Sequence, residues 1–448
     1  MCTAIAGRKC CGSSYAQVVG MADKIEGILT DDGEDGFIYP RYDGYCVSNV
    51  PHTVMELLGG KAKGTELKKE TYARADTDGI ERVVLLTVDS LGYDMWHDNA
   101  KNSELLKLFN RHGSVEPITT VFPSTTAAAV TTINTGLTPL QHGLLEWTLY
   151  FEEIGMVIHP LPFTALTKRR ESLHERGVDS KILYNGSTIY QAMKRNGISS
   201  ATLKSKHLIG TDYNKTIQKG ADEMGYTSAT DMVIKIRKNL ENPKGPEFIS
   251  AYTDMVDSMT HVYGPYTEES REETLLLFNL MERLLLRKIS RGAAKKTLLI
   301  ITADHGHIST DPNKTIYLNR YKGLGSYYAK DRAGECIPPT GGPRDVFLHI
   351  KENLEDEAYE YLYGRLGKTA RIMRLDEIME RGLFGKGKPN KMFYNRLGNM
   401  MLLPYGNNTV WYEHVKGVRR KHIGHHGGMS RDEMLIPLAV ARLSDLML

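Results

Sequence analysis

The sequence predicts an α/β fold, with a largely parallel central sheet flanked by helices. Three short runs, Arg82–Val88, Glu247–Tyr252 and Leu298–Thr302, are rich in β-branched, aliphatic and aromatic residues. Continuous apolar runs of this length are typical of strands buried on both faces, as in parallel sheets covered by helices. Open α/β sheets bind ligands outside the carboxyl ends of their strands. The residues that follow the three runs are therefore the first candidates for a functional site.

Acidic and imidazole side chains follow all three predicted strands. Asp89 comes after the first, Asp257 and His261 come after the second, and Asp304-His305 comes after the third. Carboxylate oxygen and imidazole nitrogen are suitable ligands for zinc, manganese or iron. A solvated polar turn explains any one of these segments, but their recurrence at three strand ends indicates a metal site.

A further histidine segment, His425-His426-Gly427-Gly428, lies near the C-terminus and precedes an apolar run at 433–438. Glycine after histidine permits the close backbone turns that a ligand shell often requires. Taken alone, this loop is better interpreted as a flexible surface turn.

A cluster of hydroxyl side chains precedes a predicted helix. Pro123-Ser124-Thr125-Thr126 is followed by an alanine-rich stretch at 127–135, which Gly136 ends. Alanine favours helix, Ser and Thr are common N-caps, and glycine is frequent where helices stop. A hydroxyl at that helix end faces free N–H groups and the positive end of the helix dipole, which favour an anion. Simple capping is the alternative, but beside a metal site such a hydroxyl is a candidate nucleophile.

Six motifs in a fixed order carry a family resemblance. They are Val88-Asp89, Phe122-Pro-Ser-Thr-Thr126, Thr135-Gly-Leu-Thr-Pro139 with His142-Gly143, Asp257-x-x-x-His261, Asp304-His305-Gly306 and His426-Gly427. This set resembles the alkaline phosphatase superfamily, and within it is most similar to the type I phosphodiesterase/nucleotide pyrophosphatase branch. The similarity extends from about Arg82 to the C-terminus.

The resemblance implies two divalent metal ions, zinc in the first place and manganese or iron as alternatives. The implied ligands are Asp257, His261 and His426 for one ion, and Asp89, Asp304, His305 and the Thr126 oxygen for the other. The Pro-x-x-Thr spacing places the nucleophile at Thr126, with Thr125 and Ser124 as alternatives. His426 matches the pattern better than His425, because the family ligand directly precedes the glycine.

The implied activity is metal-dependent hydrolysis of phosphodiester or phosphoanhydride bonds, through a phosphothreonine intermediate on Thr126. Its substrate would be a small phosphate ester such as a nucleotide. The segment Pro117–Gly143 contains no Lys or Arg, which disfavours phosphomonoester dianions. Two other classes stay open. One is a phosphomonoesterase or phosphonate hydrolase of the same fold, and the other is a silent binding protein, which would have lost ligands or nucleophile.

The implied architecture is an alkaline phosphatase-like catalytic domain at 81–448 with an inserted cap. The cap comes from insertions at about 150–245 and 310–420, and an N-terminal extension at 1–80 packs on the core. Trp147, Tyr150 and Phe151 could line the substrate entrance, although core packing is the more common role of aromatic residues. His142 is expected to hold a turn. His307 is expected either to orient a ligand carboxylate or to lie on the surface.

Composition sets further bounds. The net charge is +3 and 25% of residues are charged, with no dense Lys/Arg run, so nucleic-acid binding is not expected. The sequence has no apolar stretch of 18 residues, so a membrane span is not expected. Five cysteines and an N-terminus unlike a signal peptide favour the cytoplasm. Cys2, Cys10 and Cys11 lack the spacing of a metal site, and the oligomeric state is left open.

Overall fold

The central sheet has seven strands in the order β2-β18-β9-β1-β8-β6-β7. This is a computed structural model, which describes residues 23–30, 35–167, 169–419 and 421–447. The strands are β2 (Ser114–Thr119), β18 (Leu435–Arg442), β9 (Thr297–Thr302), β1 (Arg82–Val88), β8 (Phe248–Thr253), β6 (Ser200–Ser205) and β7 (Asp222–Tyr226). β18 runs antiparallel to both of its neighbours, β2 and β9, and the other pairs of this sheet are parallel. The predicted α/β class with a largely parallel sheet is confirmed.

The three strands predicted from sequence, β8, β1 and β9, lie side by side at the middle of the sheet. Val88 at the end of β1 pairs with Thr253, and Thr87 pairs with Thr302. The strands are buried along almost their whole length, as their unbroken apolar runs predict. Their carboxyl ends are therefore in register, and the residues that follow them meet at one edge of the sheet.

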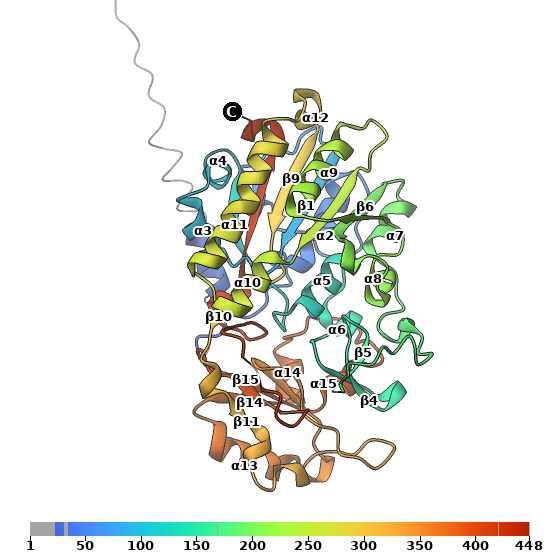
Figure 1. Cartoon of the computed structure of the whole chain (residues 1–448), viewed down its shortest axis with the longest axis vertical. Coiled ribbons are helices and arrows are strands. Elements are labelled where there is room, and N and C mark those ends of the chain that lie inside the picture. The colour runs from blue at the N-terminus through green and yellow to red at the C-terminus, as the bar shows by residue number, and fades with distance from the viewer. Residues whose placement is uncertain (1–22, 31–34, 168, 420, 448) are drawn as a thin grey trace, which may run out of the picture.

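Two groups of contacting helices flank this sheet. One group is α3 (Tyr93–Ala100), α4 (Glu104–His112), α9 (Ala229–Glu241) and α11 (Glu268–Met281). The other is α2 (Val50–Leu57), α5 (Thr126–Thr135), α7 (Ile189–Arg195) and α8 (Asp212–Ile217). Figure 1 shows α9 and α11 in front of the central sheet. Among the described residues, no helix is long and apolar enough to cross a membrane.

Smaller sheets lie below the central sheet in Figure 1, beyond α5 and α10 (Met255–Tyr263). One is antiparallel, in the order β12-β13-β15-β14, and another is β3-β4-β5. Their strands are β3 (Leu149–Phe151), β4 (Met156–His159), β5 (Thr164–Ala165), β12 (Thr340–Gly342), β13 (Asp345–Leu348), β14 (Ala370–Arg374) and β15 (Met400–Pro404). Two short pairs are β10 (Ile308–Ser309) with β17 (Gly424–His425) and β11 (Ile316–Tyr317) with β16 (Val410–Trp411). The other helices are α6 (Pro139–His142), α12 (Arg291–Lys295), α13 (Glu355–Leu366), α14 (Leu375–Glu380), α15 (Phe393–Leu397) and α16 (Arg431–Met434).

The stretches predicted as an N-terminal extension and a cap contribute both to the central sheet with its helices and to the smaller sheets. Val47, Val50 and Val54, from the N-terminal stretch, belong to the hydrophobic core of the central sheet. Within 150–245, β6 and β7 are strands of the central sheet itself, whereas β4 and β5 are not. The domain boundaries stay a prediction, and the central sheet takes more of that stretch than an insertion would suggest.

Candidate metal centre

The residues that follow β1 and β9 form a buried cluster. His305 Nε2 lies 3.3 Å from Asp89 Oδ1 and 3.5 Å from Asp304 Oδ2. All three side chains are buried, and one ligand atom from each lies within 4.8 Å of the other two. The structure therefore brings together three of the four ligands predicted for one ion.

Backbone and tyrosine donors hold these carboxylates in place. The N–H groups of Ser90 and His305 donate to Asp304 Oδ1 at 3.2 and 3.0 Å, and the Tyr252 hydroxyl donates to Asp89 Oδ2. The opposite oxygens, Asp89 Oδ1 and Asp304 Oδ2, accept no hydrogen bond from any described residue. Buried carboxylate oxygens without donors fit a bound cation.

His305 is oriented for metal binding. Its Nδ1 lies 3.0 Å from the carbonyl of Gly306 and donates to it. Nε2 then carries the lone pair and faces the two carboxylates. A histidine whose second ring nitrogen is held by a carbonyl is a common arrangement for a metal ligand.

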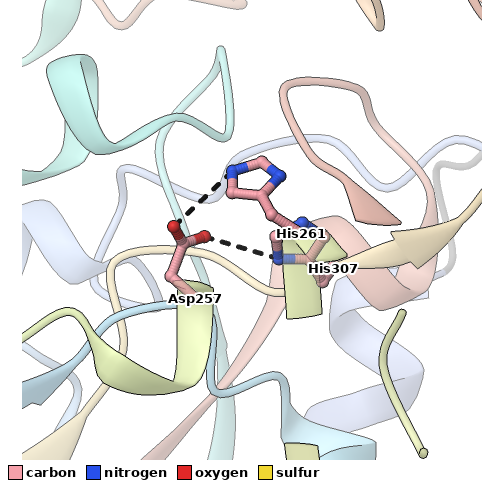
Figure 2. Close-up of side chains that lie close together, drawn as sticks. All are labelled: Asp257, His261 and His307. Atoms are coloured by element: carbon pink, nitrogen blue, oxygen red, sulfur yellow. Dashed lines mark ion pairs between the residues drawn. The ribbon is translucent and has the colours of Figure 1, made fainter. Parts of the chain in front are cut away.

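Asp257 and His261 form the second cluster, on α10. Their spacing of four residues puts both on one helix face, and His261 Nε2 lies 3.5 Å from Asp257 Oδ2 (Figure 2). Asp257 also groups with His305 and His426 within 4.8 Å, and His426 Nδ1 lies 3.0 Å from the carbonyl of Ser124. The other two ligands predicted for this ion, His261 and His426, thus lie beside the Asp257 carboxylate.

The pKa shifts in both clusters indicate that the buried carboxyl groups lack compensating positive charge within the described protein. Burial, with Asp304 and Asp257 nearby, raises the pKa of Asp89 well above its ordinary value. Burial raises the pKa of Asp257 to about 7. Burial, with neighbouring imidazoles, holds the pKa of His426 well below its usual range, so this ring stays neutral. A neutral imidazole at His426, and two carboxyl groups whose ionised form is disfavoured by burial, both fit a bound divalent metal ion.

His307, whose role the sequence left open, also belongs to the second cluster. Its Nδ1 lies 3.6 Å from Asp257 Oδ1 (Figure 2), 2.6 Å from Ser90 Oγ and 3.0 Å from Thr260 Oγ1. Asp257, His261 and His307 form a third group of ligand size. The signal in the sequence is its place two residues after His305, on a segment that turns back toward α10.

Hydroxyl groups surround His307 Nδ1. The hydroxyls of Ser90 and Thr260, which both contact Nδ1, lie 2.9 Å apart, and the Thr260 hydroxyl donates to the Asp257 carbonyl at 2.9 Å. These contacts hold the His307 ring beside the Asp257 carboxylate, in a position to orient this candidate ligand.

This arrangement predicts that His307 and Ser90 strengthen metal binding through Asp257. His307→Ala should weaken binding of one ion by roughly 10- to 100-fold, as is usual when a residue that orients a ligand is removed. Ser90→Gly should also weaken metal binding. Backbone strain is not the cause, because the Ser90 φ of 72° suits glycine better than serine. Competition with a chelator measures both affinities, with exposed His207→Ala as control. Unchanged affinity in both variants would contradict this role.

The three candidate nucleophiles are separated by their hydrogen bonds. Thr125 Oγ1 caps α5, accepting from the Ala128 N–H at 3.3 Å and donating to the Leu145 carbonyl at 3.0 Å. Ser124 Oγ donates to the Gly428 carbonyl at 2.7 Å. Thr126 Oγ1 lies 3.1 Å from His305 Nε2, at the first position of α5. Of the three hydroxyls, only that of Thr126 is turned toward the ligand cluster.

A cavity of about 420 Å³ opens over Thr126 and the second cluster. Trp147 lines it, which was the less favoured of its two predicted roles. Tyr150 and Phe151 are buried, as the more favoured prediction of core packing has it. Glu146 and Arg170 also line it, and neither could be placed there from sequence. The remaining lining residues are Thr125, Ala127, Asp257, His261, Gly342, Pro343, His422, His425 and His426.

Two lesser expectations concern His142 and the cysteines. His142 is fully buried, its Nδ1 accepts from the Leu144 N–H at 3.1 Å and its Nε2 lies 3.0 Å from Thr132 Oγ1. It therefore holds the turn after α5, as predicted. Cys46 and Cys336 are unpaired, and the Cys2, Cys10 and Cys11 trio lies outside the described residues.

Curated proteins match this chain in sequence over about three fifths of its length. Venom phosphodiesterase 2 of Crotalus adamanteus is 22% identical over 287 residues, covering 61% of this chain and 32% of the venom protein. A pyrophosphatase/phosphodiesterase of Schizosaccharomyces pombe, itself uncharacterised, is 24% identical over 297 residues, covering 64% of this chain and 55% of its own. The chain thus spans about a third of the venom protein and about half of the yeast protein.

Solved structures share the fold. Murine ectonucleotide pyrophosphatase/phosphodiesterase 5 superposes with a TM-score of 0.60 at 16% identity, over 80% of this chain and 88% of that protein. The human protein of the same name gives 0.58 at 19% identity, over the same shares. The family model for type I phosphodiesterase/nucleotide pyrophosphatase matches residues 83–429, a span that contains every candidate ligand and the Thr126 hydroxyl. The chain belongs to the type I phosphodiesterase/nucleotide pyrophosphatase family.

Proposed function

We propose that this protein hydrolyses phosphodiester or phosphoanhydride bonds of small phosphate esters, with Thr126 as the nucleophile. The observation that carries the proposal is the position of the Thr126 hydroxyl. It lies 3.1 Å from His305 Nε2, at the start of α5 and in the wall of the cavity. A hydroxyl at a helix N-terminus, beside a cluster of metal-ligand type, has both an anion site and the means to become a nucleophile.

The proposal includes two divalent ions, with zinc as the first candidate because the ligands mix nitrogen and oxygen. Asp89, Asp304, His305 and Thr126 would hold one ion, and Asp257, His261 and His426 would hold the other. When bound, the ions lower the pKa of a coordinated hydroxyl and neutralise charge on the phosphoryl oxygens. The buried carboxylate oxygens without donors support this ligand set.

The residues of the chain divide the reaction into two steps. The Thr126 hydroxyl loses its proton to solvent and its Oγ attacks phosphorus. The P–O bond to the leaving alcohol or phosphate breaks, the leaving oxygen takes up a proton from solvent, and a phosphothreonine ester forms. The N-terminus of α5 favours the anionic phosphoryl group throughout. Water then hydrolyses the phosphothreonine ester. This step restores the Thr126 hydroxyl and releases the phosphoryl group with the second product.

The relatives support this chemistry and a nucleotide-type substrate. The venom proteins bear the name phosphodiesterase. One murine structure is an inactive variant, with alanine replacing a threonine, in complex with AMP. A threonine nucleophile and a nucleoside monophosphate product are therefore our proposals for this chain. A cytoplasmic location also stays a prediction.

The alternative, a phosphomonoesterase or phosphonate hydrolase, gains one observation from the structure. Arg170 lines the cavity, so a cation from a distant segment reaches the site that Pro117–Gly143 leaves without one. Glu146 lines the same cavity and is buried. In its ionised form, a carboxyl group there would oppose the second negative charge of a phosphomonoester.

We therefore expect diesters to be the better substrates. The kcat/KM for the p-nitrophenyl ester of thymidine 5′-monophosphate should exceed that for p-nitrophenyl phosphate by at least about tenfold, or roughly 1.4 kcal/mol. Arg170→Ala should lower the monoester rate more than the diester rate, because a dianion gains more from the guanidinium. A reversed preference in the wild-type protein would favour the phosphatase alternative.

A further inference from the structure

A buried ion pair contacts the loop that carries His426. Arg344 donates from Nε and Nη2 to the two carboxylate oxygens of Glu433, at 2.9 and 2.8 Å, and both side chains are fully buried. The third guanidinium nitrogen, Nη1, donates to the carbonyl of Asn408. Burial alone would raise the pKa of Glu433, but Arg344 and the hydrogen bonds to the carboxylate hold this pKa below its ordinary value. The pair is therefore ionised, and each charge has its counter-charge.

The Glu433 carboxylate also accepts hydrogen bonds from this loop. The Gly428 N–H donates to Oε1 at 3.0 Å, and the N–H and hydroxyl of Ser430 donate to Oε2 at 3.3 and 2.6 Å. The backbone carbonyl of Glu433 accepts from the Gly306 N–H at 2.9 Å, directly after the candidate ligand His305. One residue thus contacts two of the backbone segments that carry candidate ligands.

Ser124 binds the same loop from the nucleophile segment. Its hydroxyl donates to the Gly428 carbonyl at 2.7 Å and accepts from the Gly427 N–H at 3.0 Å. Its own carbonyl accepts from His426 Nδ1 at 3.0 Å, which leaves Nε2 of that ring for a metal ion. Because Thr126 is two positions further along the chain, these contacts fix the loop against the segment that carries the candidate nucleophile.

The close approach of the ion pair to the loop requires glycine at position 428. A Cβ atom at Gly428 would lie 2.8 Å from Glu433 Oε2 and 3.1 Å from Arg344 Nη2, which is too close for the ion pair to stay in place. The residue before Arg344, Pro343, lines the cavity. The ion pair therefore joins the wall of the cavity to the loop that carries one candidate ligand.

The chemistry of the pair favours a positioning role over a purely structural one. Two apolar side chains of similar volume often stabilise a protein as well as a buried ion pair does, because removing charges from water is costly. Apolar side chains could not accept the hydrogen bonds from Gly428 and Ser430. A carboxylate has two oxygens, so Glu433 accepts from the loop and from Arg344 at the same time.

We propose that Arg344, Glu433 and Ser124 are positioning residues, which hold His426 at the ion of the second cluster and fix its loop against the segment of Thr126. They act through the loop and not as ligands. This role rests on the proposed function, because it concerns the same metal centre. Groups that orient a metal ligand commonly change metal affinity when they are removed, even though they do not bind the ion.

Retention of Zn²⁺ against a chelator tests this role without hydrolysis. Ser124→Ala removes a single hydroxyl, so the fold should survive, but one of the two ions should be held roughly 10- to 100-fold more weakly. The other ion should be held as in the wild type. Gly428→Ala should have the same effect, although it removes no hydrogen-bonding group. As a control, Ser103→Ala removes the buried N-cap of α4 and should lower the melting temperature alone.

A double-mutant cycle separates positioning from stability. Arg344→Met leaves Glu433 buried without its counter-charge and should destabilise the protein. Adding Glu433→Leu removes the second charge and should restore much of the melting temperature. The weakened ion should nevertheless stay weakly held, because Gly428 and Ser430 have lost their acceptor. Metal retention that recovers together with stability would overturn the positioning role, and so would wild-type retention in both Ser124→Ala and Gly428→Ala.

The same variants distinguish a failure of this role from a failure of the proposed function. Ser124→Ala should lower kcat for a diester by a similar factor and change KM little, because the substituted side chain binds no substrate. If no ester is hydrolysed by the wild type but the metal results hold, the proposed function fails and the positioning role stands. If the wild type hydrolyses diesters and Ser124→Ala keeps both ions and full kcat, the reverse is true.

Discussion

Thr126→Ala should lower phosphodiester hydrolysis by roughly 10³- to 10⁵-fold, the range expected when a covalent nucleophile is removed. The fold should survive, because the Thr126 side chain is only partly buried and its one described hydrogen-bond partner is His305. Both predicted ions should remain bound, since each keeps three other ligands. Steady-state kinetics, a melting curve and elemental analysis of the same preparation measure all three.

Neighbouring hydroxyls provide matched controls for this prediction. Thr125→Ala removes the N-cap of α5 and should cost about 1 kcal/mol of stability, with little loss of rate in the folded protein. Thr126→Ser keeps a hydroxyl and should retain part of the activity. If Thr125→Ala loses the activity and Thr126→Ala keeps it, the assignment of the nucleophile is wrong by one residue.

The sequence was sufficient for the centre of the fold and for the innermost cluster. β1, β8 and β9 are central strands buried on both faces, so their composition alone separates them from helices and loops. Asp89, Asp304 and His305 follow such strands directly, and strands in register bring their next residues together. Local pattern and long-range contact therefore agree for this cluster.

Sequence composition could not predict the edge strands or the contacts between residues that are far apart in the chain. β7, Asp-Glu-Met-Gly-Tyr, lies at the sheet edge with one buried residue among its five, and its composition offers no apolar run to detect. β6 contains three hydroxyl residues and one lysine within six positions. Polar strands of this kind are defined by the neighbour with which they pair, and this is why the stretch at 150–245 looked like an insertion throughout.

The cavity wall shows the same limit. Glu146 and Pro343 both line the cavity although they are far apart in the sequence, and each is unremarkable in its own segment. Arg170 reaches the cavity from a segment without any site motif. His307 gave a signal, because it is two residues after His305, but its role follows only from its contacts with Ser90, Thr260 and Asp257. Tertiary contacts, not local pattern, assign all of these residues.

Removal of divalent metal should lower the activity by roughly 10³-fold or more, because such ions supply several kcal/mol of transition-state stabilisation. Elemental analysis should find two transition-metal ions per chain before treatment with EDTA and none after it. Added Zn²⁺ or Mn²⁺ should restore the rate. Protein shown to be metal-free that still hydrolyses a diester at the original rate would refute both the ligand set and the mechanism.

The metal-free protein should also respond to pH in a defined direction. The pKa of Asp257, about 7 in the folded chain, lies above the ordinary value of about 3.9 for an unfolded chain. Between these values the folded state binds a proton that the unfolded state has lost, so stability falls as pH rises from about 4 to about 7. Asp89 contributes in the same direction, because its pKa is also raised.

Metal should reverse this trend, since bound cations favour the ionised carboxylates. Melting temperatures of metal-free and zinc-loaded protein should therefore diverge as pH rises toward 8. Asp257→Asn removes the titrating group, so its metal-free form should lose part of the pH dependence. The zinc-loaded variant should bind one ion in place of two. A metal-free wild-type protein that becomes more stable from pH 5 to pH 8 would show that these carboxyl groups are already compensated within the protein, and the argument for two bound ions would lose its electrostatic basis.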